Sequence, residues 1–218
     1  MRLILIRHGQ TTSNVIRALD TAAPGADLTD LGREQAAAVP DALADERIDA
    51  IYVSNLVRTQ QTAAPLAAAR GLEPIIRDGL REVEAGDLEM KTDFDSMKAY
   101  VGTFIQWAEE HYDRRIPGGE NGNEAFERFD AVVAEATAAG YQSVAIVSHG
   151  AMIRYWVARA TVNIDAEFTS KNDLTNTAVV VVTGDPQSGW LTESWTGQAI
   201  GGPQLTDLAA DGPAAETV

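Results

Sequence analysis

Two histidines of this chain directly follow apolar runs, and each directly precedes a glycine. Residues 3–9 read LILIRHG, which places His8 after four apolar residues and one arginine. Residues 144–150 read VAIVSHG and place His149 in the same way. The chain has three histidines in all. An imidazole that is neutral near pH 7 can attack a substrate or hydrogen-bond to it, so the repeated placement indicates chemistry rather than packing.

The elements that position these histidines are predicted to be strands. A Leu/Ile/Val run without polar alternation is typical of a strand that is covered on both faces, as in parallel sheets. Reactive groups gather beyond the carboxyl ends of such strands. If the two runs are neighbouring parallel strands, His8 and His149 emerge on the same edge. Gly9 and Gly150 then let backbone N–H groups approach an anion.

Two arginines indicate that the bound anion is a phosphate ester. A phosphate dianion is best bound by fixed positive charge with donors in a planar fork, which arginine supplies. Arg7 lies beside His8, and Arg58 lies at the start of a predicted helix over 56–70. Taken alone, Arg58 would be assigned to the surface. Cations nearby also lower the pKa of an imidazole from its usual value of about 6.5, which keeps it neutral and nucleophilic.

The remaining pattern predicts an α/β protein with a mostly parallel central sheet between two helical layers. Strands are expected from residue 2 and near residues 51, 75, 144, 179 and 190. Helices are expected over about 30–45 and 56–70, twice within 92–139, and from residue 151. We expect one domain over 1–200, a small helical cap inserted at about 90–140, and a mobile tail over 201–218.

Several short motifs along the chain resemble, in order, those of the histidine phosphatase superfamily, also called the phosphoglycerate mutase-like family. The resemblance extends to about residue 182, and the 117–120 segment with Arg128 resembles its phosphatase branch. The segments that carry it are RHGQT at 7–11 with Asn14, LT at 28–29 with Gly32, SNLVRTQQTA at 54–63, LRE at 80–82, PGGE at 117–120, and VSHG at 147–150.

The resemblance implies a histidine acid phosphatase-type phosphomonoesterase that uses neither metal nor cofactor. Its substrate would be a small phosphorylated metabolite. It assigns the nucleophile to His8, the general acid and base to Glu82, and stabilisation of the transition state to His149. Geometry from sequence alone does not decide which histidine attacks. The residues assigned to the substrate phosphate are Arg7, Asn14, Arg58 and Gly150.

Other interpretations remain open. A mutase would return the phosphoryl group to a phosphorylated sugar acid, and a catalytically silent module would only bind a phosphorylated ligand. Arg114 and Arg115 could hold a second anionic group or could simply end a helix as cations, and His111 is expected at the surface. A metallohydrolase is disfavoured because a dication beside Arg7 and Arg58 would be repelled.

Composition limits the partners. The formal net charge of −15 argues against nucleic acid or an anionic membrane as a partner. The chain has no cysteine, and its first apolar run is too short for a signal peptide or a membrane span. We therefore expect a cytoplasmic protein, and the sequence leaves a homodimer open.

Overall fold

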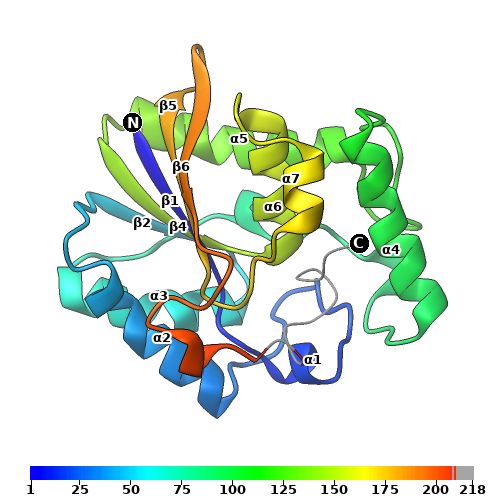
Figure 1. Cartoon of the computed structure of the whole chain (residues 1–218), viewed down its shortest axis with the longest axis horizontal. Helices are drawn as coiled ribbons and strands as arrows, with labels where there is room; N and C mark the ends of the chain where they lie inside the picture. The colour runs from blue at the N-terminus through cyan, green and yellow to red at the C-terminus, as the bar shows by residue number, and fades with distance from the viewer. Residues whose placement is uncertain (208, 210–218) are drawn as a thin grey trace.

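The computed structural model describes residues 1–207 and 209, and within them it contains one six-stranded sheet (Figure 1). The strand order is β3-β2-β4-β1-β5-β6. The four strands from β3 to β1 are parallel, whereas β5 runs antiparallel to β1 and β6 antiparallel to β5. The bounds are β1 Arg2–Arg7, β2 Ala50–Val53, β3 Ile75–Ile76, β4 Ser143–Ser148, β5 Val179–Asp185 and β6 Gly189–Trp195.

Most helices begin at a residue whose side chain accepts a hydrogen bond from the first turn, as is usual for Ser, Thr, Asp and Asn. Thr29 does so for α2, Asp93 for α4, and Asn121 for α5 in a reciprocal arrangement with Glu124. The helices of the described residues are α1 Thr12–Val15, α2 Asp30–Ala42, α3 Val57–Arg70, α4 Phe94–Ala108, α5 Gly122–Ala138, α6 Gly150–Ala160 and α7 Ala166–Lys171. Short 3₁₀ turns occur at η1 Asp78–Leu80, η2 Gly86–Leu88 and η3 Pro203–Leu205.

The alternating side chains of the central strands enter two separate cores. Ile4 and Ile6 of β1 pack with α2 and α3 on one face of the sheet. Leu3 and Leu5 of the same strand pack with α5 and α6 on the other face. Both layers are visible in Figure 1. Burial on both faces explains why β1 and β4 read as continuous apolar runs.

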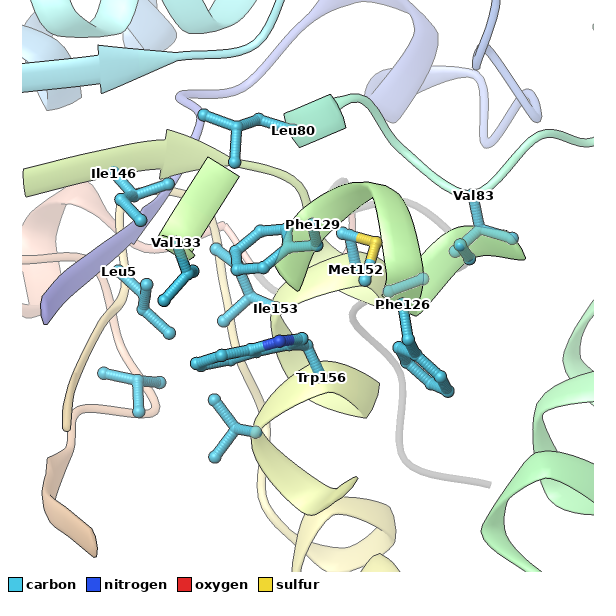
Figure 2. Packing of buried hydrophobic residues seen from close by; sticks show 14 of the residues in the cluster. Leu5, Leu80, Val83, Phe126, Phe129, Val133, Ile146, Met152, Ile153 and Trp156 are labelled. Atoms are coloured by element: carbon cyan, nitrogen blue, oxygen red, sulfur yellow. The ribbon is translucent and has the colours of Figure 1, made fainter. Parts of the chain in front are cut away.

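Aromatic side chains fill the core beneath α5 and α6. Figure 2 shows Phe129 of α5 beside Trp156 of α6, and the centroids of their rings lie 4.9 Å apart. The Trp156 indole also donates a 2.7 Å hydrogen bond to Asp130 of α5. These contacts fix α6, whose first residue follows His149, against the sheet.

The predicted fold class is confirmed: the sheet is mostly parallel and helices cover both faces. Two features differ from the expectation. The segment predicted as a cap contains helices α4 and α5 within the described residues. Helix α4 contributes a side chain to the candidate site, whereas α5 packs on the sheet. Helices α1 and α7 were not predicted. The parallel sheet ends at β1, where β5 reverses direction and forms a hairpin with β6.

The segment predicted as a mobile tail is described only at its start. Residues 201–207 include η3, and the backbone carbonyl of Leu205 accepts a 2.6 Å hydrogen bond from Gln35 of α2. Residues 208 and 210–218 of the predicted tail lie outside the described residues. Among those that are described, no helix is long and apolar enough to cross a bilayer.

Candidate active site

The sheet topology brings His8 and His149 together. Strands β1 and β4 are parallel neighbours with Arg7 opposite Ser148, so the next residue of each strand leaves the sheet at the same edge. The backbone N–H of His8 donates to the carbonyl of Ser148 at 3.0 Å. The centroids of the two imidazole rings are 5.2 Å apart. The predicted pairing of these histidines is therefore present in the structure.

One hydrogen bond determines the tautomer of His8. Its Nδ1 lies 2.7 Å from the backbone carbonyl oxygen of Gly9. A carbonyl oxygen can only accept, so Nδ1 must carry the proton and Nε2 must carry the lone pair. His8 lines a pocket with an empty volume of about 400 Å³. The ring thus presents one unprotonated nitrogen for attack on a ligand.

His149 is held differently. Its Nε2 lies 2.9 Å from the hydroxyl of Ser54, which follows β2, and its side chain is completely buried. Among the described residues, Nδ1 of His149 has no hydrogen-bond partner. If the Ser54 hydroxyl donates to Nε2, then Nδ1 carries a proton that a ligand can accept. A buried polar atom without a partner in the protein is what a site for a polar ligand requires.

Both histidines are neutral near pH 7. Burial lowers the pKa of each well below its ordinary value, and the positive charge of Arg58 lowers it further. Arg7 acts in the same direction on both rings. Desolvation and like charge both disfavour the imidazolium form. The free site therefore contains imidazoles that can donate and accept without first losing a proton.

The two arginines lie deep in the pocket with 1% and 3% of their surfaces exposed. Arg7 donates to the carbonyl oxygen of Leu174 at 2.6 Å. Arg58 donates from Nη2 to the carbonyl oxygen of Asp20 at 2.9 Å, while its Nε and Nη1 have no hydrogen-bond partner among the described residues. Buried guanidinium N–H groups of this kind suit a phosphate oxygen.

Glu82 lies at the N-terminus of α6. Its carboxylate accepts hydrogen bonds from the backbone N–H groups of Ala151 at 3.1 Å, Met152 at 2.9 Å and Val83 at 2.9 Å. Glu82 thereby caps the N-terminus of α6, because the side chain of the N-cap residue His149 makes no capping hydrogen bond. Glu82 also lines the pocket with Arg7 and His8. A carboxylate therefore faces the same space as the two arginines.

Glycines make the loop around His8 possible. A Cβ on Gly9 would lie 2.7 Å from the carbonyl oxygen of Gly32, and a Cβ on Gly32 would lie 2.1 Å from that of Gln10. The loop after β1 and the first turn of α2 thus touch backbone to backbone, which larger residues would prevent. The N–H of Gly9 donates to the Thr62 hydroxyl at 2.9 Å, which ties this loop to α3.

Of the predicted site residues, Arg7, His8, Asn14, Arg58 and Glu82 line the pocket. The rings of His149 and His8 lie 5.2 Å apart, but neither His149 nor Gly150, which begins α6, is among the lining residues. The idea that Arg114 and Arg115 hold a second anion is wrong for this pocket: both are exposed, neither lines it, and Arg115 pairs with Glu124 at 2.6 Å. His111 is exposed, as expected.

Sequence reasoning assigned no role to five polar residues of the pocket wall: Thr11, Ser13, Asp20, Thr21 and Tyr100. Tyr100 comes from α4, is buried, and donates to the carbonyl oxygen of Val83 at 2.7 Å. Its place in an apolar helical stripe resembles that of a core residue. Thr11 caps α1 and Ser13 lies within it, whereas Asp20 and Thr21 lie in the loop that follows; none of the four obeys a spacing rule that would single it out.

The family model of the histidine phosphatase superfamily (branch 1) matches residues 3–196, which covers every residue of the site described above. This chain belongs to the histidine phosphatase superfamily. The predicted family is confirmed. Members among the relatives include the adenosylcobalamin/alpha-ribazole phosphatase of Escherichia coli, which is 34% identical over 73% of this chain and 78% of its own length.

Other relatives differ in name and length. PE_PGRS11 of Mycobacterium tuberculosis is 35% identical over 92% of this chain, but the chain spans only 37% of that protein. A probable phosphoglycerate mutase GpmB of Erwinia tasmaniensis is 29% identical over 97% of this chain and 98% of its own length. A mycobacterial glucosyl-3-phosphoglycerate phosphatase solved with VO3 has a TM-score of 0.75 at 28% identity, covering 89% of this chain and 98% of its own.

Proposed function

We propose that this chain hydrolyses the phosphomonoester of a small metabolite through a phosphohistidine at His8. The observation that carries the proposal is the 2.7 Å hydrogen bond from Nδ1 of His8 to Gly9, which leaves the Nε2 lone pair in a pocket with two buried arginines. The phosphatase names of relatives support the same reaction class.

The first step transfers the phosphoryl group to the enzyme. Nε2 of His8 attacks phosphorus and forms a P–N bond as the ester P–O bond breaks. Arg7, Arg58 and Nδ1 of His149 stabilise the equatorial oxygens, where negative charge is concentrated. The departing alkoxide takes a proton from Glu82.

The second step releases phosphate. A water molecule gives a proton to Glu82 and attacks phosphorus, the P–N bond breaks, and the Nε2 lone pair returns to His8. The backbone N–H donors of Val83, Ala151 and Met152 hold the Glu82 carboxylate in the position from which it accepts this proton. One carboxyl group thus serves as acid and then as base.

The proposal includes metal independence of the histidine acid phosphatase type, because Arg7 and Arg58 supply the positive charge that a metal would bring. Activity should therefore survive treatment with a chelator, and loss that a divalent ion restores would contradict this part. Three further proposals rest on the family and on the negative charge of the chain. They are a cytoplasmic location, a small-molecule substrate rather than nucleic acid or a membrane, and a homodimer.

A panel of phosphomonoesters tests the proposal against the mutase. Each ester is incubated with the protein, and inorganic phosphate is measured; 3-phosphoglycerate is also given with and without a bisphosphoglycerate primer. We expect phosphate release to dominate. Primer-dependent formation of 2-phosphoglycerate much faster than phosphate release would favour the mutase, and ligand binding without turnover of any ester would favour a silent binding module.

A further inference from the structure

The loop over residues 19–26 forms one wall of the pocket and is fixed from two sides. Glu89 accepts hydrogen bonds from the backbone N–H and the hydroxyl of Thr21, at 2.9 and 2.5 Å. On the other side, the N–H of Val57 at the start of α3 donates to the carbonyl oxygen of Pro24 at 2.9 Å. The loop therefore presents Asp20 in a defined place.

The Asp20 side chain, 9% exposed, forms its hydrogen bonds within this wall. Its Oδ2 accepts from the hydroxyl of Ser13 at 2.7 Å and from the backbone N–H of Ala26 at 2.9 Å. The same oxygen lies 3.8 Å from Nη1 of Arg58, and the backbone carbonyl of Asp20 accepts from Nη2 of Arg58 at 2.9 Å. Asp20 thus contacts two side chains that line the pocket, Ser13 and Arg58.

Arg58 needs such a partner. An arginine side chain loses rotamer entropy when it is held in one orientation, and its planar fork binds a phosphate with two hydrogen bonds only when it is so oriented. Asp20 holds one end of the guanidinium through its carbonyl and its charge, while Nε and Nη1 keep no hydrogen-bond partner within the described residues. Gly25 lies against the same end of the guanidinium: a Cβ there would lie 2.6 Å from Nη1 and 3.5 Å from Oδ1 of Asp20.

We propose that Asp20 is a positioning residue that orients Arg58 and the Ser13 hydroxyl toward the substrate phosphate. The inference rests on the proposed phosphatase function, and it names a residue outside the motifs that define the site. Asp20 does not touch the reacting atoms. It acts through Arg58, so its effect on turnover depends on that arginine being present.

A double-mutant cycle on kcat/KM for p-nitrophenyl phosphate tests this dependence, with Asp20→Asn, Arg58→Ala and the double variant. Asn keeps the size of the side chain and an oxygen for Ser13 and Ala26, but it removes the charge beside Arg58. We expect Asp20→Asn to lower kcat/KM about 10- to 100-fold in the wild-type background. In the Arg58→Ala background, the same change should cost less than about twofold, since no guanidinium is left to orient.

Asp27→Asn is the matched control, because Asp27 lies in the same segment, is exposed and bonds to Gln61 outside the pocket. It should leave kcat/KM within about twofold of wild type. Equal losses from Asp20→Asn with and without Arg58 would overturn the proposal, as would an Asp20→Asn variant as active as the control. A wild-type protein that hydrolyses no phosphomonoester would instead contradict the proposed function itself.

A second variant keeps the test valid if Asp20→Asn does not fold. Gly25→Ala keeps the Asp20 side chain and introduces a methyl group 2.6 Å from Nη1 of Arg58, and the φ of +74° at this position strains the loop as well, so only a loss that depends on Arg58 supports the proposal. It should lower kcat/KM in the wild-type background and have little further effect in the Arg58→Ala background. Unchanged activity of a folded Gly25→Ala variant would contradict the claim that this wall orients Arg58.

Discussion

At the residue scale, the chemistry of the site depends on which polar atoms already have a hydrogen-bond partner in the protein and which remain available to a ligand. His8 uses Nδ1 on a carbonyl and keeps Nε2 for a ligand, and His149 uses Nε2 on Ser54 and keeps Nδ1. Glu82 accepts from three backbone N–H groups. These bonds set the orientation of each group before substrate binds, so little reorganisation is needed during the reaction.

The proposed proton transfer by Glu82 predicts a dependence on the leaving group. Glu82→Gln removes the proton that the departing alkoxide needs, so an alkyl phosphate should be hydrolysed about 10²- to 10⁴-fold more slowly. An activated aryl ester such as p-nitrophenyl phosphate barely needs this proton and should lose much less in its phosphorylation step. Single-turnover rates for both esters measure the effect.

Glu84→Gln is the control for this prediction, because Glu84 is a neighbouring acid that pairs with Arg81 and does not line the pocket. It should affect both esters equally and only slightly. If Glu82→Gln slowed the alkyl and aryl esters by the same factor, the acid role would be wrong, and Glu82 would act mainly by capping α6.

At the scale of the elements, the pocket is built by two neighbouring parallel strands, by helices α1, α3 and α4, and by the loops that carry Asp20 and Glu82. Strands β1 and β4 deliver the histidines to one edge, and α4 closes a side through Tyr100. The Tyr100 hydroxyl bonds to the carbonyl of Val83, the residue after Glu82. Helix α4 is thereby linked to the backbone that carries the proposed acid.

This link predicts a cost for Tyr100→Phe. The carbonyl oxygen of Val83 would lose a buried partner, which should lower the free energy of unfolding by about 1–3 kcal/mol. Because Val83 follows Glu82, kcat/KM should fall as well. Urea unfolding and steady-state kinetics measure both. Tyr112→Phe is the control in the same insertion, since its ring is only half-buried; equal stability losses in the two variants would refute the link.

The strands that position the histidines could be predicted from the sequence, because their residue pattern indicates one kind of element. The apolar runs at 3–6 and 144–147 are typical of strands that are buried on both faces, and parallel pairing then places His8 beside His149. Tyr100 and Asp20 could not be found this way. The first occupies a helical position that core and pocket residues share, and the second acts through a loop whose path depends on distant bonds to Glu89 and Val57.

At the scale of the whole molecule, the buried neutral histidines link the site to stability. The folded protein keeps the pKa of His8 and of His149 well below 6.5, mainly because both rings are buried. In the unfolded chain, both titrate at about 6.5. Below this pH, the unfolded chain binds protons that the folded protein does not bind, so the free energy of unfolding falls as the pH decreases.

Urea unfolding between pH 7.5 and 5 should show this fall. Each of the two histidines contributes a slope of up to about 1.4 kcal/mol per pH unit in this window. His149→Asn should reduce the slope by one histidine's share. A slope in His149→Asn that equals that of the wild type would show that His149 is not held neutral by burial.

Identification of the phosphorylated residue tests the central claim most directly. The protein is mixed with a ³²P-labelled phosphomonoester, quenched within milliseconds in alkali and digested with trypsin, which cleaves after Arg7. The label should appear on the peptide over residues 8–17, which contains His8, and should be stable to base and labile to acid; His8→Ala should carry none. Label on the peptide over residues 129–154, which contains His149, or undiminished turnover by His8→Ala would contradict the assignment of His8 as the nucleophile.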